Sequence, residues 1–361
     1  MALLSASEAS LIDPMTQSYH LHRCFSTMKF FIAVVLCLLI NSSSVACNIP
    51  VFRYALERWQ PDSCELIVFH KGPLSPGQQQ LLQELDGQRT KREDSASTSL
   101  TLSDLSAPTP THASLWQSIT STTKQVAATP YLVVRMKLGK GRTINGWHGS
   151  LSDAVKIGIL DSPARHELAK RLLAGHSVVW LMIRPGKESR LASEVRELNT
   201  STQKSLAVNF PLLSQELTLP EGIGLPGSEL HSEIPLLLKF SLLEIERDDP
   251  REAFLVNLFS QIQPEASEQG EALIVPVFGR GRALEVIPAS SLTSQLTKDL
   301  TVFLSGACSC QVKEQNPGFD LLMSVDWESE LFGEGIAPPR VRSTRDRLNK
   351  QPELLSIPPG K

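Results

Sequence analysis

The sequence predicts an α/β protein of two sheet-plus-helix domains with mixed sheets. Short apolar runs typical of buried strands alternate along the chain with segments of helical period. A stretch rich in Pro and Gly at 211–235 separates two such groups. The length of 361 residues corresponds to two domains of roughly 150 residues each. The expected order of elements is β-α-β-α-β-α, a linker, and then β-α-β-β-α.

We expect the first domain at 47–210. One helix begins at Ser162, a preferred N-cap residue that is followed by Pro163 at the first helical position, and it ends at Gly175. The run VVWLMI at 178–183 is apolar throughout, as expected for a strand buried on both faces of a sheet. The other expected elements are a short amphipathic helix or turn at 53–59, strands at 65–69 and 131–136, and helices at 78–86 and 191–198.

Residues 87–129 differ in composition from their surroundings. Ser and Thr occupy 17 of these 43 positions, and neither a helical nor a strand period is sustained. We therefore expect a long surface insertion or flexible linker here. Because structureless loops of this length are unusual inside a domain, a short helix is expected at 115–119.

The second domain is expected at 236–332, after the linker at 211–235. Its first helix follows Asp249-Pro250-Arg251-Glu252, a capping-box arrangement with Asp in place of Ser or Thr. Strands at 273–278 and 284–287 are joined by a Gly-Arg-Gly-Arg sequence, which predicts a hairpin. Further expected elements are strands at 236–245 and 320–325 and a helix at 292–304. From 333 to 361 the chain has no hydrophobic period, and we expect a disordered tail.

The N-terminal region predicts export. Residues 30–40 (FFIAVVLCLLI) form an apolar run of 11 residues, preceded by Lys29 and followed by small residues up to Ala46. A membrane-spanning helix needs about 20 apolar residues, so we interpret 28–46 as a removable secretory signal peptide. Because a signal begins close to its initiator, Met28 is the expected start, and residues 1–27 are an expected extension of the gene model.

Cleavage after Ala46 would leave Cys47 as the first residue. A bacterial lipoprotein signal places its lipidated Cys at this position, but Ser44 stands where Leu is usual. Two alternatives follow: a released periplasmic or extracellular protein, and a protein anchored to the membrane by a lipid on Cys47. Both compartments permit disulfides.

Composition and charge exclude several classes of protein. With 41% hydrophobic and 20% charged residues, the chain is not collagen-like, wholly disordered or a multi-span membrane protein. Lys and Arg number 35 against 38 Asp and Glu, a formal net charge of -3. This balance gives no electrostatic case for a nucleic-acid partner.

The stretch from Leu236 to Leu304 is expected to run strand, helix, antiparallel hairpin and closing helix. In this order, and in its hairpin IVPVFGRGRALEVI, it resembles the C-terminal half of the thioredoxin-like fold. That family carries a Cys-x-x-Cys motif after its first strand, where this chain has His70-Lys71-Gly72-Pro73, so the resemblance implies the fold and not dithiol exchange. The family's Pro before the hairpin is also displaced, since Pro276 lies inside the strand. The whole chain is similar to uncharacterised exported bacterial proteins, which implies no activity.

Four cysteines follow the expected cleavage site, namely Cys47, Cys64, Cys308 and Cys310. All four are disulfide candidates, and four cysteines allow three pairings. A pair of Cys47 with Cys308 or Cys310 would tie the N-terminal segment to the second domain. Cys308 and Cys310, separated by one residue, are also a candidate site for Cu(I) or Zn(II), or a candidate redox pair.

The other candidate ligand residues are His70, His148, Arg280 and Arg282. The two histidines are expected near strand ends, where α/β proteins bind ligands, and the two arginines on the hairpin could bind an anion. The sequence Asp326-Trp327-Glu328 could support carboxylate chemistry. Ser177 resembles the nucleophile of a hydrolase elbow, but it joins a helix to a strand instead of a strand to a helix, so no hydrolase is expected.

The sequence contains no complete catalytic or cofactor motif. It therefore favours an exported, non-catalytic module of the cell envelope or extracellular space, with no cofactor. Such a module would bind an unknown envelope or extracellular partner and would meet the membrane only through its signal or a lipid anchor. The alternative is a thiol-redox or Cu(I)-handling protein that uses Cys308 and Cys310.

Overall fold

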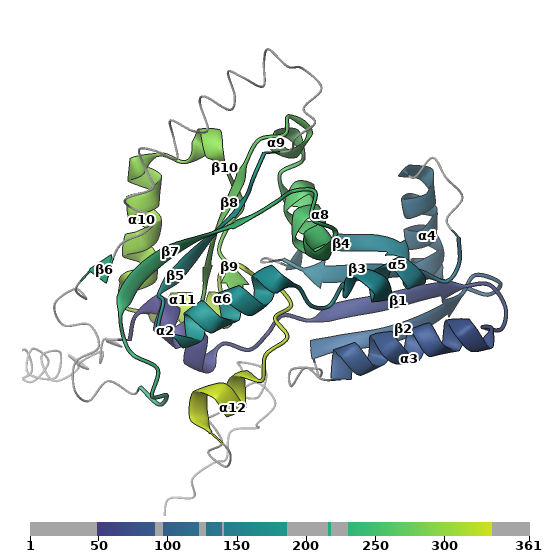
Figure 1. Cartoon of the computed structure of the whole chain (residues 1–361), viewed down its shortest axis with the longest axis horizontal. Helices are drawn as coiled ribbons and strands as arrows, with labels where there is room; N and C mark the ends of the chain where they lie inside the picture. The colour runs from purple at the N-terminus through teal and green to yellow at the C-terminus, as the bar shows by residue number, and fades with distance from the viewer. Residues whose placement is uncertain are drawn as a thin grey trace, which may run out of the picture. The chain divides into compact units, whose positions relative to one another are not determined.

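The protein has an α/β fold with two mixed sheets, as the sequence predicts (Figure 1). A computed structural model of the chain describes residues 49–90, 97–122, 128–138, 141–185, 216–217 and 230–333. These residues belong to one compact unit. In this part of the chain, one sheet has four strands and the other has seven.

The four-stranded sheet has the order β2-β1-β3-β4. Its strands are β1 (Cys64–His70), β2 (Thr98–Asp104), β3 (Tyr131–Lys137) and β4 (Thr143–Ser150). Strand β1 is parallel to β2 and antiparallel to β3, and β3 is antiparallel to β4. Three helices accompany this sheet: α3 (Pro76–Thr90), α4 (Pro110–Thr122) and α5 (Leu151–Ile157).

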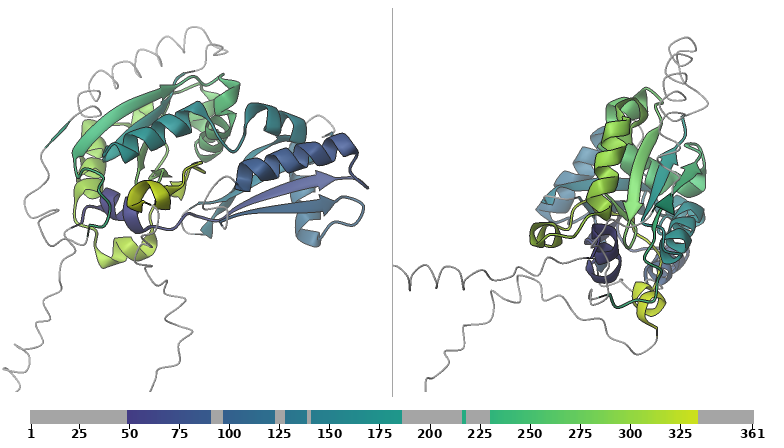
Figure 2. Two further views of the ribbon diagram at one scale, coloured as in Figure 1. Left: turned by 60° about the horizontal axis from the view of Figure 1, so that its bottom comes forward. Right: turned by 90° about the vertical axis from the view of Figure 1, so that its left-hand side faces the viewer.

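The two faces of the four-stranded sheet are covered by different helices (Figures 1 and 2). Successive side chains of a strand point to opposite faces. Leu66 and Val68 of β1 join a core that includes Leu85 of α3. Ile67 and Phe69 join a second, smaller cluster with side chains of α4. The apolar run in β1 is therefore buried from both sides.

The seven-stranded sheet has the order β11-β9-β8-β5-β7-β6, and β10 also pairs with β8. Its strands are β5 (Val178–Ile183), β6 (Glu216–Leu217), β7 (Leu238–Ile245), β8 (Leu273–Phe278), β9 (Arg282–Ala283), β10 (Ile287–Pro288) and β11 (Phe319–Asp320). The accompanying helices are α2 (Val51–Arg58), α6 (Pro163–Leu173), α8 (Ala253–Ile262), α9 (Pro264–Glu268), α10 (Ser294–Ser305), α11 (Cys310–Gln315) and α12 (Trp327–Phe332), with short 3-10 turns at 250–252 and 289–291.

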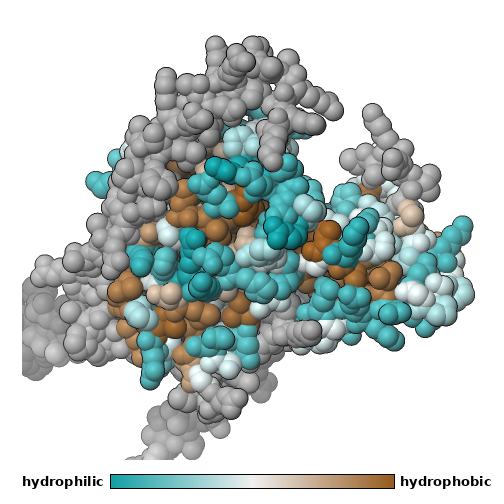
Figure 3. All heavy atoms as spheres, in the orientation of Figure 1, coloured by the Kyte–Doolittle hydropathy of each residue, from teal (hydrophilic) through white to brown (hydrophobic). Residues whose placement is uncertain are grey.

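The fully apolar strand β5 lies at the centre of this sheet and serves two cores. Val179, Leu181 and Ile183 pack in the cluster that contains residues of α6 and α8. Val178 and Trp180 pack on the other face, in the cluster that contains residues of α2 and α10. Strand β5 is parallel to β7 and antiparallel to β8, so the expected strand buried on both faces is confirmed within a mixed sheet. On the side drawn in Figure 3, hydrophobic and hydrophilic surface lie next to each other.

The two sheets share one connectivity. When the two-residue edge strands β6 and β11 of the second sheet are set aside, the first strand of each sheet lies between a parallel second strand and an antiparallel third strand, and the third strand pairs with an antiparallel fourth. In the second sheet, the fourth strand is divided into β9 and β10, which both pair with β8. A helix follows the last strand of each set, α5 in the first and α10 in the second. The sequence shows no repeat that predicts this duplication.

Helix α8 connects the two halves, because it packs against β4 of the other sheet. The contact depends on a glycine. A Cβ atom at Gly146 would lie 3.1 Å from Met136 Cγ and 3.4 Å from both Leu258 Cδ1 and Phe254 Cε2. One apolar cluster consequently includes side chains of both sheets.

Several local predictions are confirmed. Ser162 caps α6, since its Oγ accepts the backbone N–H of Arg165, and Pro163 stands in the first turn. Asp249 caps the short turn before α8 by accepting from the backbone N–H of Arg251. The short helix or turn expected at 53–59 is α2, and the helix expected at 292–304 is α10.

The expectation of an insertion without sustained structure at 87–129 is wrong for much of that stretch. It contains the end of α3, strand β2 and helix α4, which includes the short helix expected at 115–119. Strand β2 is an edge strand in which Thr98 and Ser103 are buried while Ser99 and Leu102 are exposed. Helix α4 covers only a small cluster through Leu115, Trp116 and Ile119. Neither element therefore carries a strong hydrophobic period.

Two expected strands near the C-terminus are also corrected. The strand expected at 284–287 is divided between β9 and β10, because Pro276 has no N–H to donate at the middle of β8. The strand expected at 320–325 is reduced to Phe319–Asp320, since Leu322 has φ +54° and leaves the extended conformation. The stretch 143–157, for which the sequence predicts no element, forms β4 and α5.

Other predictions fall outside the described residues. These are the gene-model extension at 1–27, the signal peptide at 28–46, the role of Cys47, the helix at 191–198 and the tail beyond Gly333. Of the expected linker at 211–235, residues 216–217 pair with β7 and residues 230–235 are described. Within the described ranges, no helix is long and apolar enough to cross a bilayer.

The His148 side chain predicts a pH dependence of stability. Its Nδ1 lies 2.9 Å from Tyr131 Oη, and burial lowers the pKa of His148 below its usual value. An unfolded His titrates at about pH 6.5. As the pH falls from that value toward the lower folded pKa, the unfolded chain binds more protons than the folded chain, so the free energy of unfolding decreases.

When the pH is lowered from about 7.5 to about 5, we expect the free energy of unfolding to decrease less in His148→Gln than in the wild type. Urea unfolding at several pH values measures this difference. Equal pH dependence in the two proteins would contradict the assignment to His148.

Candidate functional site

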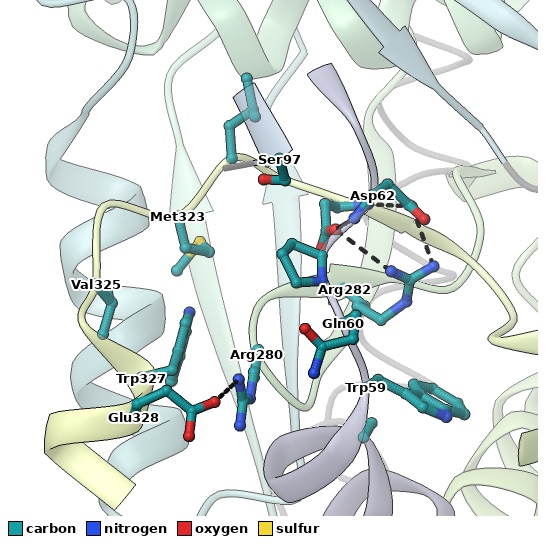
Figure 4. A pocket seen from close by; sticks show the side chains of 14 residues that line it. Trp59, Gln60, Asp62, Ser97, Arg280, Arg282, Met323, Val325, Trp327 and Glu328 are labelled. Atoms are coloured by element: carbon teal, nitrogen blue, oxygen red, sulfur yellow. Dashed lines mark hydrogen bonds and ion pairs between the residues drawn. The ribbon is translucent and has the colours of Figure 1, made fainter. Parts of the chain in front are cut away.

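A pocket of about 400 Å³ lies where α2, the β8–β9 turn and the C-terminal segment meet (Figure 4). Aromatic and aliphatic side chains and five charged groups line it together. The lining residues are Ala55, Trp59, Gln60, Pro61, Asp62, Ser97, Arg280, Arg282, Asp320, Leu322, Met323, Val325, Trp327 and Glu328. A concave site with an apolar lining and a few convergent polar groups is the usual form of a small-molecule site.

The first wall comes from the end of α2 and the chain that leads to β1. Helix α2 ends at Arg58, where the Trp59 N–H donates to Ala55 O at 3.4 Å. Pro61 cannot continue the helix, and the chain runs on to Asp62. Trp59 is buried, and its ring packs edge-to-face against Phe278 with centroids 5.9 Å apart.

The second wall is the β8–β9 turn, which requires glycine at two positions. Gly279 and Gly281 have φ values of +59° and +83°. A Cβ atom at Gly279 would lie 2.6 Å from Ala55 Cβ, and one at Gly281 would lie 2.2 Å from Met323 Cγ. The Gly-Arg-Gly-Arg sequence therefore forms the expected turn and also lets both neighbouring walls approach it closely.

The third wall is the C-terminal segment. Its strand β11 pairs with β9, with Asp320 opposite Arg282, and the Leu321 N–H donates to Gly281 O at 3.1 Å. The chain then leads to α12, whose N-cap Asp326 accepts from the Ser329 N–H at 2.8 Å. In Figure 4, Met323, Val325 and Trp327 line one side of the pocket from this segment.

The Arg282 side chain, which is only 2% exposed, holds the three walls together. Its Nη2 donates to Asn316 O and Gly318 O, both at 3.0 Å, and its Nε donates to Pro317 O at 3.3 Å. A buried guanidinium needs such partners, because an unpaired charge out of water is very costly. The side chain thereby fixes the backbone that precedes β11.

Two carboxylates complete the surroundings of Arg282. Its Nη2 lies 3.2 Å from Asp62 Oδ2, and its Nη1 lies 3.4 Å from Asp320 Oδ2. The aspartates also bind each other's backbone: the Asp62 N–H donates to Asp320 Oδ2, and the Asp320 N–H donates to Asp62 Oδ2. The guanidinium lies over the Trp59 ring, 5.8 Å from its centroid. Charge and backbone pairing thus join the first and third walls.

Arg280 binds the C-terminal end of α2. Its Nε donates to Leu56 O at 2.7 Å and its Nη2 donates to Glu57 O at 3.1 Å. These carbonyl groups lie in the last turn of the helix, where a cation is favourable. Its Nη1 forms an ion pair with Glu328 Oε1 at 2.7 Å. Arg280 therefore ties α2 to α12 across the pocket (Figure 4).

The charges of the pocket do not cancel. Three carboxylates face two guanidinium groups, which leaves one net negative charge. Both guanidinium groups are already engaged by carboxylates and backbone carbonyls. Asp62 Oδ1 makes no hydrogen bond to any described residue, so it can accept one from a ligand. The pocket consequently favours a positive group over a negative one.

The structure brings Arg280 and Arg282 together, as their neighbouring places on the hairpin imply, but the two histidines lie elsewhere. His148 binds Tyr131 on the α4 face of the first sheet, whereas His70 Nδ1 lies 2.8 Å from Gly72 O beyond the end of β1. No contact joins these histidines to each other within the described ranges. Ser177 is fully buried, and its Oγ donates to Leu237 O at 2.6 Å, so it supports the backbone beside β7.

The described cysteines lie in different environments. Cys64 and Cys308 are buried, and Cys310 is exposed at the first position of α11. The Cys308 N–H donates to Ile49 O at 2.9 Å, next to a β-bridge between Pro50 and Ala307. The N-terminal segment is therefore tied to the end of α10 through its backbone. Cys47 lies outside the described residues, and the disulfide pairings stay a prediction.

A Cu(I) or Zn(II) site at Cys308 and Cys310 also stays a prediction. Among the residues that the structure describes, no group of three or more His, Cys, Asp or Glu side chains is placed to hold a metal ion. No known protein family matches this chain, and no curated protein matches it.

Most of the pocket was not predictable from local patterns. Trp327 and Glu328 belong to a sequence that we singled out for carboxylate chemistry, and both line the pocket. Trp59, Asp62 and Asp320 carry no motif. The strongest local signal is the pair of glycines beside two arginines, because it marks a turn that other segments approach closely.

Substitution of Arg282 tests this arrangement. Arg282→Met would remove the buried guanidinium that Asp62 and Asp320 contact, and we expect a loss of about 3 to 5 kcal/mol in the free energy of unfolding. Urea unfolding measures the change. Arg251→Met is the matched control, because the Arg251 side chain is 65% exposed in its pair with Asp249, and it should change stability little. Equal effects of the two substitutions would contradict the structural role of Arg282.

Proposed function

We propose that this chain is a non-catalytic binding protein of the cell envelope or extracellular space, whose pocket takes a small molecule with a positively charged group. The way in which the charged side chains of the pocket are paired supports this class of ligand. The arginines of the pocket are engaged by the protein itself, the lining carries three carboxylates against two guanidinium groups, and the Asp62 Oδ1 atom accepts no hydrogen bond from a described residue.

The apolar lining favours a ligand with a hydrophobic or aromatic body. Trp327, Met323 and Val325 form a continuous apolar side beside Glu328 (Figure 4). An indole ring attracts cations through its face as well as apolar groups. A pocket of about 400 Å³ has room for a molecule of the size of an aromatic amine.

The repeated connectivity of the sheets supports a thioredoxin-like fold for both halves. Apart from the two-residue edge strands, each sheet places its first strand between a parallel second and an antiparallel third strand. In the second sheet, β7, α8, the β8–β9 hairpin and α10 follow the order of strand, helix, hairpin and closing helix that the sequence resembles. In the first half, Pro130 directly precedes the β3–β4 hairpin. The end of β1 and the start of the following loop, His70 to Pro73, contain no cysteine, so no dithiol exchange is proposed there.

Three probes of similar size and different charge test the ligand class. These are 2-phenylethylammonium, 3-phenylpropan-1-ol and 3-phenylpropionate. We expect the cation to bind most tightly by isothermal titration calorimetry. Glu328→Gln should raise the dissociation constant of the cation by about tenfold or less, as expected for one partly exposed charge.

Glu330→Gln is the matched control for this experiment, because Glu330 lies on the same helix and does not line the pocket. It should leave binding unchanged. Binding of the anion as tight as that of the cation, or no binding of any probe, would contradict the proposed ligand class.

Export is a separate part of the proposal, supported by the sequence of residues 28–46. The intact mass of the protein from its native envelope, with and without reduction and alkylation, tests it. We expect a chain that begins at Cys47, and an acyl increment on that residue would identify the lipid-anchored alternative. A mass that retains residues 28–46 would contradict cleavage. The same alkylation shows whether Cys308 and Cys310 react together, as the thiol-redox or Cu(I) alternative requires.

A further inference from the structure

A second hollow, which we call the basic groove, lies on the four-stranded sheet and has a volume of about 400 Å³. Its charged groups are Glu65, Arg135 and Lys137, and its hydroxyl groups come from Ser63, Ser97, Ser99 and Thr143. Ser97 also lines the pocket described above, so the two hollows are neighbours.

The pairing of the strands gathers these side chains on one face. Glu65 of β1 lies opposite Ser99 of β2 on one side and opposite Arg135 of β3 on the other. Lys137 lies opposite Thr143 of β4 in the next row. Because side chains alternate along a strand, these residues share the face that α4 covers. Helix α4 covers only the far half, at Ile67, Phe69, Tyr131 and Val133.

A β-bulge lies beside Arg135. The register of β3 and β4 shifts between Val134, which is opposite Trp147, and Arg135, which is opposite Asn145. Bulges redirect side chains and are frequent next to binding sites. The irregularity here falls at the central cation of the groove.

The groove carries more positive than negative charges, whereas the pocket carries more negative than positive charges. Two cations face one carboxylate, and the pair between Arg135 Nη1 and Glu65 Oε2 is long at 3.5 Å, with both side chains partly exposed. Such a pair is weak in water. Arg135 Nε makes no hydrogen bond within the described residues, and Lys137 is exposed without a described ion pair. Donors therefore outnumber the acceptors that the protein supplies.

We propose that the basic groove is an anion-binding site for a carboxylate or a phosphate group of a ligand. Arg135 and Lys137 supply the positive charge, and the hydroxyl groups of Ser63, Ser99 and Thr143 supply further donors. Guanidinium groups bind both kinds of anion through paired N–H donors. This site does not depend on the proposed function of the neighbouring pocket, which carries the opposite charge.

Equilibrium dialysis of the full chain with radiolabelled inorganic phosphate and, separately, with radiolabelled acetate tests the proposal. Sodium chloride keeps the ionic strength constant, because salt screens exposed charges. We expect one of the two anions to bind, and its identity distinguishes a phosphate site from a carboxylate site. Lys137→Gln should raise the dissociation constant at least about threefold, as expected for one partly screened charge.

Ser99→Asp provides a second variant that removes no cation. It adds a carboxylate opposite Glu65 on an exposed edge strand, and it should abolish binding by repulsion. Lys156→Gln is the matched control, since Lys156 is exposed on α5 and does not line the groove. Circular dichroism confirms that each variant is folded. Absence of binding by both anions, or equal binding by the wild type, Lys137→Gln and Ser99→Asp, would overturn the proposal.

Discussion

The burial of the Arg282 guanidinium is the constraint on which the pocket depends. A cation that is 2% exposed must be neutralised and hydrogen-bonded, and its partners come from two distant parts of the chain. Asp62 stands before the first strand, and residues 316–320 follow the last long helix. The turn that carries Arg282 can bury this side chain only when both segments lie in place. The pocket walls are therefore assembled together, and a local change at Arg282 should affect all of them.

Two further buried arginines follow the same principle. Arg165 donates to Leu322 O at 3.1 Å and to Ile159 O at 2.9 Å, so the C-terminal segment is held at a second point. Arg53 donates to Ile234 O and Ser232 O, and it forms a fully buried pair with Glu57. Burial lowers the pKa of Arg53, and its pair with Glu57 opposes this effect. In each case the planar guanidinium donates to backbone carbonyls of segments that belong to no regular element. Its five N–H donors are spread over three nitrogens in a fixed plane, whereas a lysine offers three donors on one atom.

The parts of the fold that the sequence predicts are those with strong local causes. The apolar run at 178–183 gives β5, and Ser162 with Pro163 gives the start of α6. The glycines at 279 and 281 give the β8–β9 turn. Strand β2 was missed because its buried positions include the polar Thr98 and Ser103 while Leu102 is exposed, and helix α4 was missed because it packs only a few apolar side chains. The pocket was missed because Asp62 and Asp320 meet through pairing of distant segments, which no local period records.

Hydrogen exchange at individual amides tests the central claim most directly, with the wild type compared with Arg282→Lys under native conditions. If Arg282 assembles the walls, exchange in the variant should be faster at Asp320 and Leu321 and at Asp62, whose amides bind across the pocket. The amides of β3, which lies in the other sheet, should keep their protection. Unchanged exchange at all of these amides, or an equal loss of protection in β3, would contradict the account.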